Sequence, residues 1–168
     1  MKKIIVGLMI AFLFIGCGSK GSEETVVVEP KLVVGKSLDA IVINDQFEKP
    51  QTIDANTKKV IFAFSKDVAH TCNDYFVTQK PTYLSDNKTQ FIADVSAAPS
   101  LIRSMFILPG LKDFKHTVLI LDDKKAAAPF RSGVDVEKIV IVYLENKTIT
   151  SIKTINSADE LKNIIQTN

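Results

Sequence analysis

From residue 38 onward, the chain alternates between short apolar runs and segments whose apolar residues repeat at helical spacing. The run at residues 60–64 is apolar at every position, which is typical of a strand buried on both faces of a parallel sheet. Further strands are predicted at residues 90–95, 117–121, 139–144 and 148–155. Strands that alternate with helices predict a layered α/β fold.

A helix is predicted over residues 67–80, directly after the first fully apolar run. Its apolar residues stand at i, i+4, i+7 and i+8, which is one face of a helix. These residues are Val68, Cys72, Tyr75 and Phe76. The spacing therefore places Cys72 on the face that turns toward the core.

Two more helices and a hairpin complete the pattern. A helix is predicted to begin at Pro99, since proline suits the first helical turn, and to end at Pro109-Gly110. Its apolar residues repeat at i, i+1, i+4 and i+5; they are Leu101, Ile102, Met105 and Phe106. The last helix follows a capping box, Ser157 with Glu160, and buries Leu161, Ile164 and Ile165. A hairpin is predicted from residues 40–43 and 51–53.

The N-terminus has a different pattern. Lys2 and Lys3 precede an unbroken apolar run at residues 4–15, which Gly16-Cys17 ends. About a dozen residues are too few for a membrane-spanning helix, which needs roughly 20. A short buried core helix is the structural alternative, but residues 18–24 are small and polar and offer no core.

This N-terminal pattern resembles a bacterial lipoprotein signal. The resemblance implies that residues 1–16 are removed and that Cys17 carries a diacylglyceryl thioether and an N-acyl group. Each buried CH₂ contributes about 0.8 kcal/mol, so several acyl chains hold a protein firmly to a membrane. The protein would then face the periplasm. Because Gly18 and Ser19 follow the cysteine where an aspartate would imply retention at the inner membrane, the outer membrane is favoured.

Residues 17–36 are interpreted as a lipidated tether, with residues 37–168 as one folded domain. Pro30 and Gly35 favour an extended linker that lets the domain stand away from the membrane. Residues 26–28 are a β-branched triplet, however, and could instead pair as an edge strand.

Charge and composition exclude several functions. The chain has 21 Lys+Arg against 19 Asp+Glu, and the signal would remove Lys2 and Lys3, so the mature protein is nearly neutral. A nucleic-acid partner is not expected, because it would need a basic surface. His70 with Asp74 suits a solvated surface pair, and His116 is interpreted as an exposed loop residue. We expect neither a metal site nor a cofactor, since two distant histidines and one cysteine do not make a zinc site.

The order of elements resembles the thioredoxin-like superfamily, in its peroxiredoxin and thiol-reductase branch. The resemblance covers residues 38–165 and rests on the element order and on three local segments, residues 35–38, 60–64 and 157–165. It implies a three-layer sandwich with a mixed central sheet and an N-terminal β-hairpin.

The active-site motif of that superfamily is altered in this sequence. Residues 69–72 read Ala-His-Thr-Cys where thioredoxins carry Cys-x-x-Cys, so alanine stands at the attacking position. Lys66 and Asp67 stand where peroxiredoxins place a proline, and no proline directly precedes residues 139–144. Dithiol chemistry needs both a low-pKa thiolate and a resolving thiol. One of the two is missing.

Cys72 therefore has three interpretations. It can be a small buried hydrophobe, a single-cysteine redox site favoured by the nearby helix N-terminus, or a site of intermolecular disulfide or metal binding. No intrachain disulfide is expected, because Cys17 is consumed by lipid.

The leading hypothesis is a non-catalytic binding or assembly module with an envelope protein as partner. Its expected contact surface is the former active-site edge, made of Ser65, Lys66, Asp67, Ala69, His70 and Thr71. A loop at residues 124–133 is its expected neighbour, in which Phe130 is interpreted as packing rather than docking. The alternatives are a single-cysteine thiol oxidoreductase or peroxidase that uses Cys72, and a heme- or metal-delivery accessory protein.

Overall fold

A computed structural model describes residues 28–167 of the chain. Cys17 and the predicted signal lie outside the described residues. The strands are β1 (Val42–Asn44), β2 (Pro50–Thr52), β3 (Lys59–Ala63), β4 (Thr89–Asp94), β5 (Leu119–Leu121), β6 (Ile139–Glu145) and β7 (Thr148–Ile155). The helices are α1 (Lys66–Val77), α2 (Tyr83–Asp86), α3 (Ser100–Ile102), the π-helical η1 (Arg103–Ile107), α4 (Leu108–Leu111), α5 (Lys124–Arg131) and α6 (Ala158–Gln166).

The central sheet is mixed, with the strand order β5-β4-β3-β6-β7. β3 pairs in parallel with β4 and antiparallel with β6, and β4 pairs in parallel with β5. β6 and β7 form a long antiparallel hairpin. β1 and β2 form the separate N-terminal hairpin. This arrangement confirms the predicted mixed sheet and hairpin.

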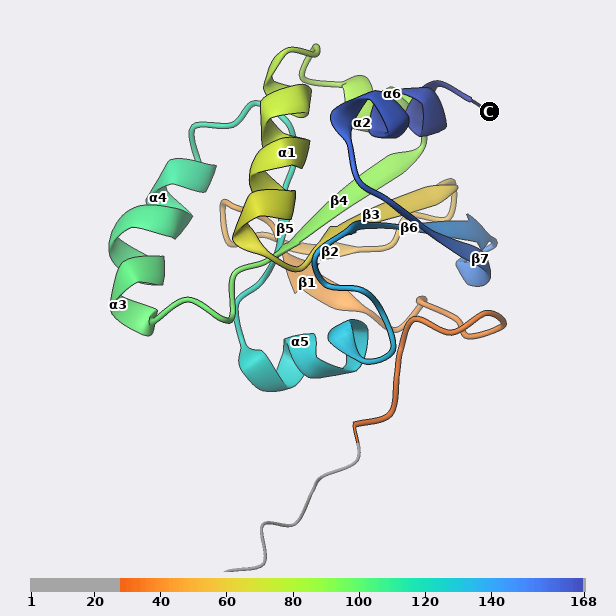
Figure 1. The fold of residues 1–168 in the computed structure, drawn as a ribbon, viewed down its shortest axis with the longest axis horizontal. Helices are drawn as coiled ribbons and strands as arrows, with labels where there is room; N and C mark the ends of the chain where they lie inside the picture. The colour runs from red at the N-terminus through yellow and green to blue at the C-terminus, as the bar shows by residue number, and fades with distance from the viewer. Residues whose placement is uncertain (1–27, 168) are drawn as a thin grey trace, which may run out of the picture.

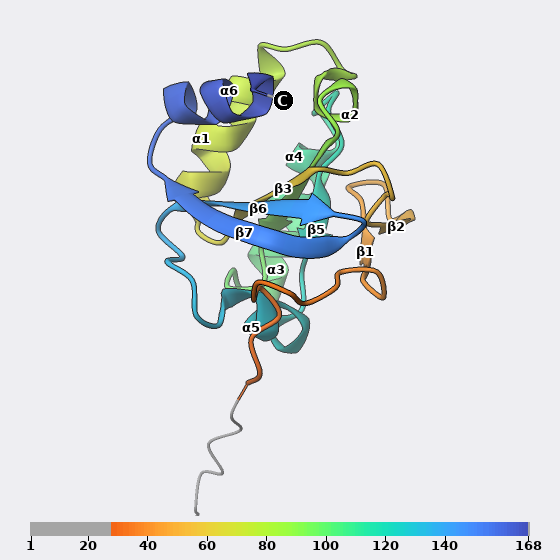
Figure 2. The same cartoon turned by 90° about the vertical axis from the view of Figure 1, so that its right-hand side faces the viewer.

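Each face of the sheet is covered by its own apolar core. One core joins Phe62 and Val140 of the sheet to Phe130 of α5, and the other joins Ile61 and Ile141 to Phe76 of α1. Two views at right angles show α1 and α6 on one side of the sheet and α5 on the other (Figures 1 and 2). The predicted three-layer α/β sandwich is therefore confirmed, and β3, which contains most of the predicted apolar run, is buried along its whole length.

The predicted capping box of the last helix is present. The Glu160 N–H donates to the Ser157 Oγ at 3.2 Å, and the Asn156 N–H donates to the Glu160 carboxylate at 3.0 Å. These bonds satisfy amide groups that a helix start leaves free. Leu161 and Ile165 are fully buried, as their spacing predicts.

The predicted end of the second helix was wrong. The helical segment continues from α3 through η1 and α4 as far as Leu111, past Pro109-Gly110. Pro109 comes just after the π-helical turn η1, where the regular ladder of i to i−4 hydrogen bonds is already interrupted.

The predicted loop at residues 124–133 is mostly helix. The Asp123 carboxylate accepts a hydrogen bond from the Ala126 N–H at 2.8 Å, which caps the start of α5, and an alanine run follows. Phe130 is 2% exposed, and its ring centroid lies 5.7 Å from that of Phe62. The interpretation of Phe130 as a packing residue is confirmed.

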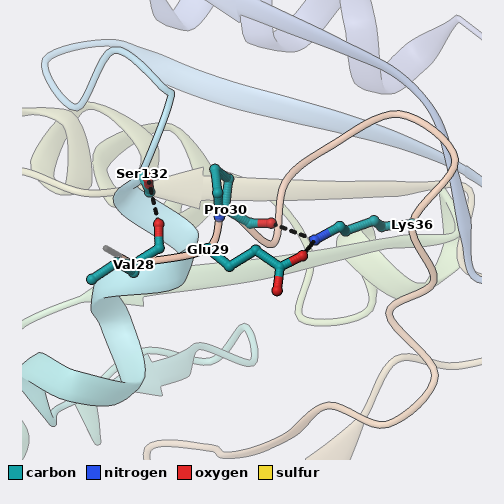
Figure 3. A network of polar contacts seen from close by, with 5 residues as sticks. All are labelled: Val28, Glu29, Pro30, Lys36 and Ser132. Carbon is teal, nitrogen blue, oxygen red and sulfur yellow. Dashed lines mark hydrogen bonds and ion pairs between the residues drawn. The ribbon is translucent and has the colours of Figure 1, made fainter. Parts of the chain in front are cut away.

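The described part of the segment interpreted as a tether packs against the domain. The Lys31 N–H donates to the Pro129 carbonyl at 2.8 Å, and Leu32 is buried in the core beneath α5. Figure 3 shows Lys36 reaching back to the Glu29 carboxylate and to the Pro30 carbonyl. The chain is thus fixed to the domain from about Lys31 onward, earlier than residue 37.

Candidate functional site

The candidate site lies at the edge of the sheet where the parallel strands β3 and β4 end. Ala63 pairs with Ala93, so the residues after each strand leave the sheet at the same edge. After β3 the chain passes through Phe64 and Ser65 into α1. In open α/β sheets, ligands bind outside the carboxyl ends of the strands.

The six residues predicted as a contact surface stand at the start of α1. Lys66, Asp67 and His70 are exposed, and Ser65, Ala69 and Thr71 are partly buried. The Thr71 hydroxyl donates to the Asp67 carbonyl at 3.0 Å. The edge thus presents a mixed-charge surface that includes an imidazole.

Ser65 is the N-cap residue of α1, yet its side chain does not cap the helix. Its backbone is extended, with φ −124° and ψ 162°, and its Oγ is buried with no hydrogen-bond partner among the described residues. N-cap serines normally accept a hydrogen bond from the second or third helical amide. The first amides of α1 therefore have no cap from the Ser65 side chain at this edge.

Cys72 lies on the inner face of α1. Its side chain is 0% exposed and packs in the core that also contains Val68 and Phe76. Burial disfavours the charged thiolate and raises the pKa of Cys72 to about 12. This is the environment of an inert core cysteine rather than of a nucleophile.

The residues next to Cys72 on α1 offer it no catalytic partner. Ala69, which the sequence resemblance aligned with the attacking cysteine, packs its methyl group against the same core. His70 is exposed on the opposite side of the helix, so the two side chains do not form a dyad. This agrees with the angular separation that the helical spacing predicts.

His116 corrects a prediction from the sequence. It is 2% exposed instead of lying in an exposed loop. Its Nε2 lies 2.9 Å from the Asn73 Oδ1, its Nδ1 has no partner among the described residues, and its ring is stacked on Phe114 at 5.0 Å. Burial lowers the pKa of His116 to about 4, so the ring is neutral at pH 7. Asn73 is 43 residues away in sequence, and no local pattern links the two.

An ion pair at the edge was missed. The Arg131 guanidinium donates to the Asp94 carboxylate at 3.0 Å, and the Asp94 side chain is fully buried. The Ser96 N–H also donates to this carboxylate, at 2.8 Å. Arg131 is 37 residues away from Asp94 in sequence, and no local pattern links the two. The pair fixes α5 to the end of β4, the strand that runs parallel to β3.

The described residues offer neither a metal cluster nor a membrane-spanning helix. Within residues 28–167, no group of three or more His, Cys, Asp or Glu side chains is placed to hold a metal ion. No helix in the same part of the chain combines the length and apolar content needed to cross a bilayer.

Comparisons with known proteins define the fold. No protein-family model matches the sequence, and no curated protein sequence matches it. Among solved structures, the thioredoxin domain of a thiol-disulfide oxidoreductase from Bacteroides vulgatus aligns with a TM-score of 0.51 and 16% identity, over 80% of this chain and 96% of that one. A protein described as a putative thiol:disulfide interchange protein DsbE from Chlorobium tepidum aligns with a TM-score of 0.53 and 10% identity, over 80% and 94%.

The chain therefore has a thioredoxin-like fold. At these identities the likeness extends to the fold alone. The chemistry has to be argued from Cys72 and from the edge around it.

Proposed function

We propose that this chain is a lipid-anchored, periplasm-facing protein whose thioredoxin-like domain serves as a non-catalytic binding or assembly module. The observation that carries the proposal is the complete burial of Cys72 on the inner face of α1. The fold is that of thioredoxins, while the one cysteine at the motif position is part of the core.

The thiol chemistry argues against an enzyme. With a pKa of about 12, roughly one Cys72 thiol in 10⁵ is ionised at pH 7. Attack on a peroxide or disulfide requires the thiolate and access to the substrate. The alternative, a single-cysteine oxidoreductase or peroxidase, would need α1 to open before each turnover.

The anchor is proposed from the N-terminal pattern. Lys2 and Lys3, the apolar run and Gly16-Cys17 together fit lipid attachment at Cys17, with the outer membrane favoured. Fractionation tests this step: the full chain should sediment with membranes, and Cys17→Ser should abolish processing and change the fraction in which the chain is found. A chain that carries no lipid on Cys17 would contradict the anchor.

The binding surface is proposed at the former active-site edge. Lys66, Asp67 and His70 are exposed at the start of α1, and Arg131, whose side chain is one-third exposed, holds the end of the neighbouring strand β4. Because the edge carries both positive and negative side chains, an envelope protein that binds it would need charged groups of both signs. Such contacts govern partner choice and association rate more than affinity.

A photo-crosslinking amino acid at position 70 tests this surface in the native membrane. We expect it to capture one defined protein, and Lys66→Ala should weaken the capture. The matched control places the same amino acid at Lys162, which is exposed on α6 away from the edge. Equal capture from both positions, or from neither, would contradict a partner at the edge. Rapid peroxide consumption that depends on Cys72 would instead support the enzyme.

A further inference from the structure

The helical segment made of α3, η1 and α4 is apolar on both its inner and its outer face. Leu111 is buried, and Ile107 and Leu108 pack against the core. Four large apolar side chains point outward instead, with exposed fractions of 64%, 44%, 58% and 65%; they are Leu101, Ile102, Met105 and Phe106. A helix that is apolar all round is normally covered on every side. We call these four residues the outer apolar face.

No charge interrupts the outer apolar face. Arg103 is the one charged residue of the segment, and its guanidinium is turned back to the Ala98 carbonyl at 3.1 Å. Contiguous exposed apolar residues mark contact with a protein or a membrane. The face includes η1, and π-helical turns are frequent at functional sites.

The position of the face relative to the N-terminal segment indicates what covers it. Figures 1 and 2, at right angles to one another, both place α3, α5 and the incoming N-terminal segment toward the same end of the molecule. That segment is held to α5 through the Lys31–Pro129 backbone bond, and the Ser132 hydroxyl donates to the Val28 carbonyl at 3.4 Å (Figure 3). The chain therefore enters the domain at the end where the outer apolar face begins.

We infer that the outer apolar face inserts into the surface of the lipid bilayer to which the chain is anchored. The inference rests on the proposed lipidation of Cys17. Between Cys17 and Lys31 the chain reaches at most about 50 Å, at roughly 3.5 Å per residue. Lipid at Cys17 thus keeps this end of the domain near the bilayer, and so raises the effective concentration of lipid at the face.

The chemistry of the face favours lipid over other occupants. A helix on a membrane buries its apolar side about 5–10 Å into the boundary between headgroups and acyl chains. Ser104 is exposed between these residues, but its hydroxyl donates to the Leu101 carbonyl at 3.2 Å. The outer apolar face therefore has no charged side chain that would select a particular protein, and a bilayer requires none. Lys124 and Lys125 are exposed on α5 at this end, but Asp122 and Asp123 offset them, so contact should depend little on anionic lipid.

A tryptophan reporter tests the inference, because the chain contains no tryptophan. Phe106→Trp is made in the full, processed chain and reconstituted into phosphatidylethanolamine vesicles with and without bromine-labelled acyl chains. The matched control is Val77→Trp. Val77 is 53% exposed at the last residue of α1, and Figure 1 shows that end of α1 away from the end where the N-terminal segment enters.

We expect bromolipid to quench the indole at position 106 strongly and its emission to shift to shorter wavelength, while the indole at position 77 stays accessible to aqueous iodide. Adding salt should change neither result. Equal quenching of the two indoles by iodide, in protein that sediments with the vesicles, would overturn the inference. Protection of the indole at position 106 in lipid-free solution that grows with protein concentration would also overturn it and assign the face to a second copy of the chain.

Failure of the anchor can be told apart from failure of the insertion. A chain that begins at residue 18 and carries Phe106→Trp lacks both the lipid and the apolar run of residues 4–15. Its sedimentation should fall, yet bromolipid should still quench the reporter once vesicles are in large excess. Sedimentation and quenching that are the same with and without residue 17 and its lipid would refute only the anchor. An absence of quenching at every vesicle concentration would refute the insertion.

Discussion

The helix α1 and the segment from α3 to α4 both carry an apolar stripe, but the two stripes have opposite relations to the core. In α1 the apolar side chains Val68, Cys72 and Phe76 all face inward and are buried. In the second segment, Leu111 faces inward while Leu101 and Phe106 face outward. A helical repeat therefore establishes an apolar stripe without specifying what covers it.

The two segments also differ in what they offer to a ligand or partner. The thiol of Cys72 is fully buried in the core, so α1 presents no accessible thiol at its surface. The segment from α3 to α4, by contrast, exposes the four large side chains of the outer apolar face. The proposed function therefore rests on the surfaces of this domain rather than on its thiol.

The largest difference between the two helical segments is expected when one phenylalanine is removed from each. Phe76 is 2% exposed, and its ring centroid lies 5.2 Å from that of Phe91. Phe76→Ala should lower the free energy of unfolding by about 3–5 kcal/mol through lost burial and a cavity. Phe106→Ala should change it by less than about 0.5 kcal/mol in lipid-free solution. Denaturant unfolding measures both, and equal losses would contradict the assignment of the two faces.

The second prediction concerns pH and the polar contact that α1 makes through Asn73 with His116. The pKa of His116 falls from 6.5 to about 4 on folding, so the unfolded chain binds the proton more readily. Stability should thus be full above about pH 6.5 and decline as pH falls toward 4, by about 3 kcal/mol. The decline in the free energy of unfolding across this range should flatten in His116→Phe.

The exposed histidine supplies the control for that experiment. His70→Gln should leave the decline between pH 6.5 and 4 unchanged, since His70 takes no part in the contact between His116 and Asn73. A decline that disappears in His70→Gln and survives in His116→Phe would contradict the buried position of His116.

A third prediction addresses the end of β4, the strand that leads into the second helical segment. Arg131→Met leaves the fully buried Asp94 carboxylate without its ionic partner. Breaking a buried pair costs about 3–5 kcal/mol. We expect about 2 kcal/mol here, because Arg131 is one-third exposed and water can partly replace it. Adding Asp94→Asn should recover part of the loss; a double variant with no recovery would contradict the ion-pair assignment.

The smallest effect is expected from restoring the missing cysteine. Ala69→Cys puts a thiol on a partly buried position in the first turns of α1, and stability should change by about 1 kcal/mol or less. A helix N-terminus favours the thiolate, so the introduced thiol should alkylate faster than Cys72. Mass spectrometry after a short exposure to iodoacetamide can assign the label to either position. Faster labelling of Cys72 would reverse the proposed roles of the two positions.

Much of the fold follows from periodicity in the sequence. The fully apolar run at β3 requires cover on both faces, and the spacing of Val68, Cys72 and Phe76 sets the inward face of α1. The Ser157–Glu160 capping box marks the start of α6. Each of these features depends on residues within a few positions of one another, so the sequence alone specifies them.

The features that sequence reasoning missed depend on distant partners. His116 is buried because Asn73 and three phenylalanine rings enclose it, and Asp94 is buried because Arg131 reaches it from another helix. No local sequence pattern links either residue to its partner. Aspartate is a typical N-cap residue, so Asp123 could have predicted the start of α5. Pro129, which disfavours a helix interior, favoured a loop instead.

The most direct test of the central claim is the alkylation rate of Cys72 in the folded full-length chain, compared with the rate in denaturant, from pH 6 to 9. We predict that the folded rate is lower by several orders of magnitude and that destabilising variants such as Phe76→Ala raise it. This would mean that the thiol reacts only when α1 opens. Rapid alkylation of the folded protein at pH 7, with an apparent pKa near or below the ordinary value of about 8.5, would contradict the claim and restore Cys72 as a redox site.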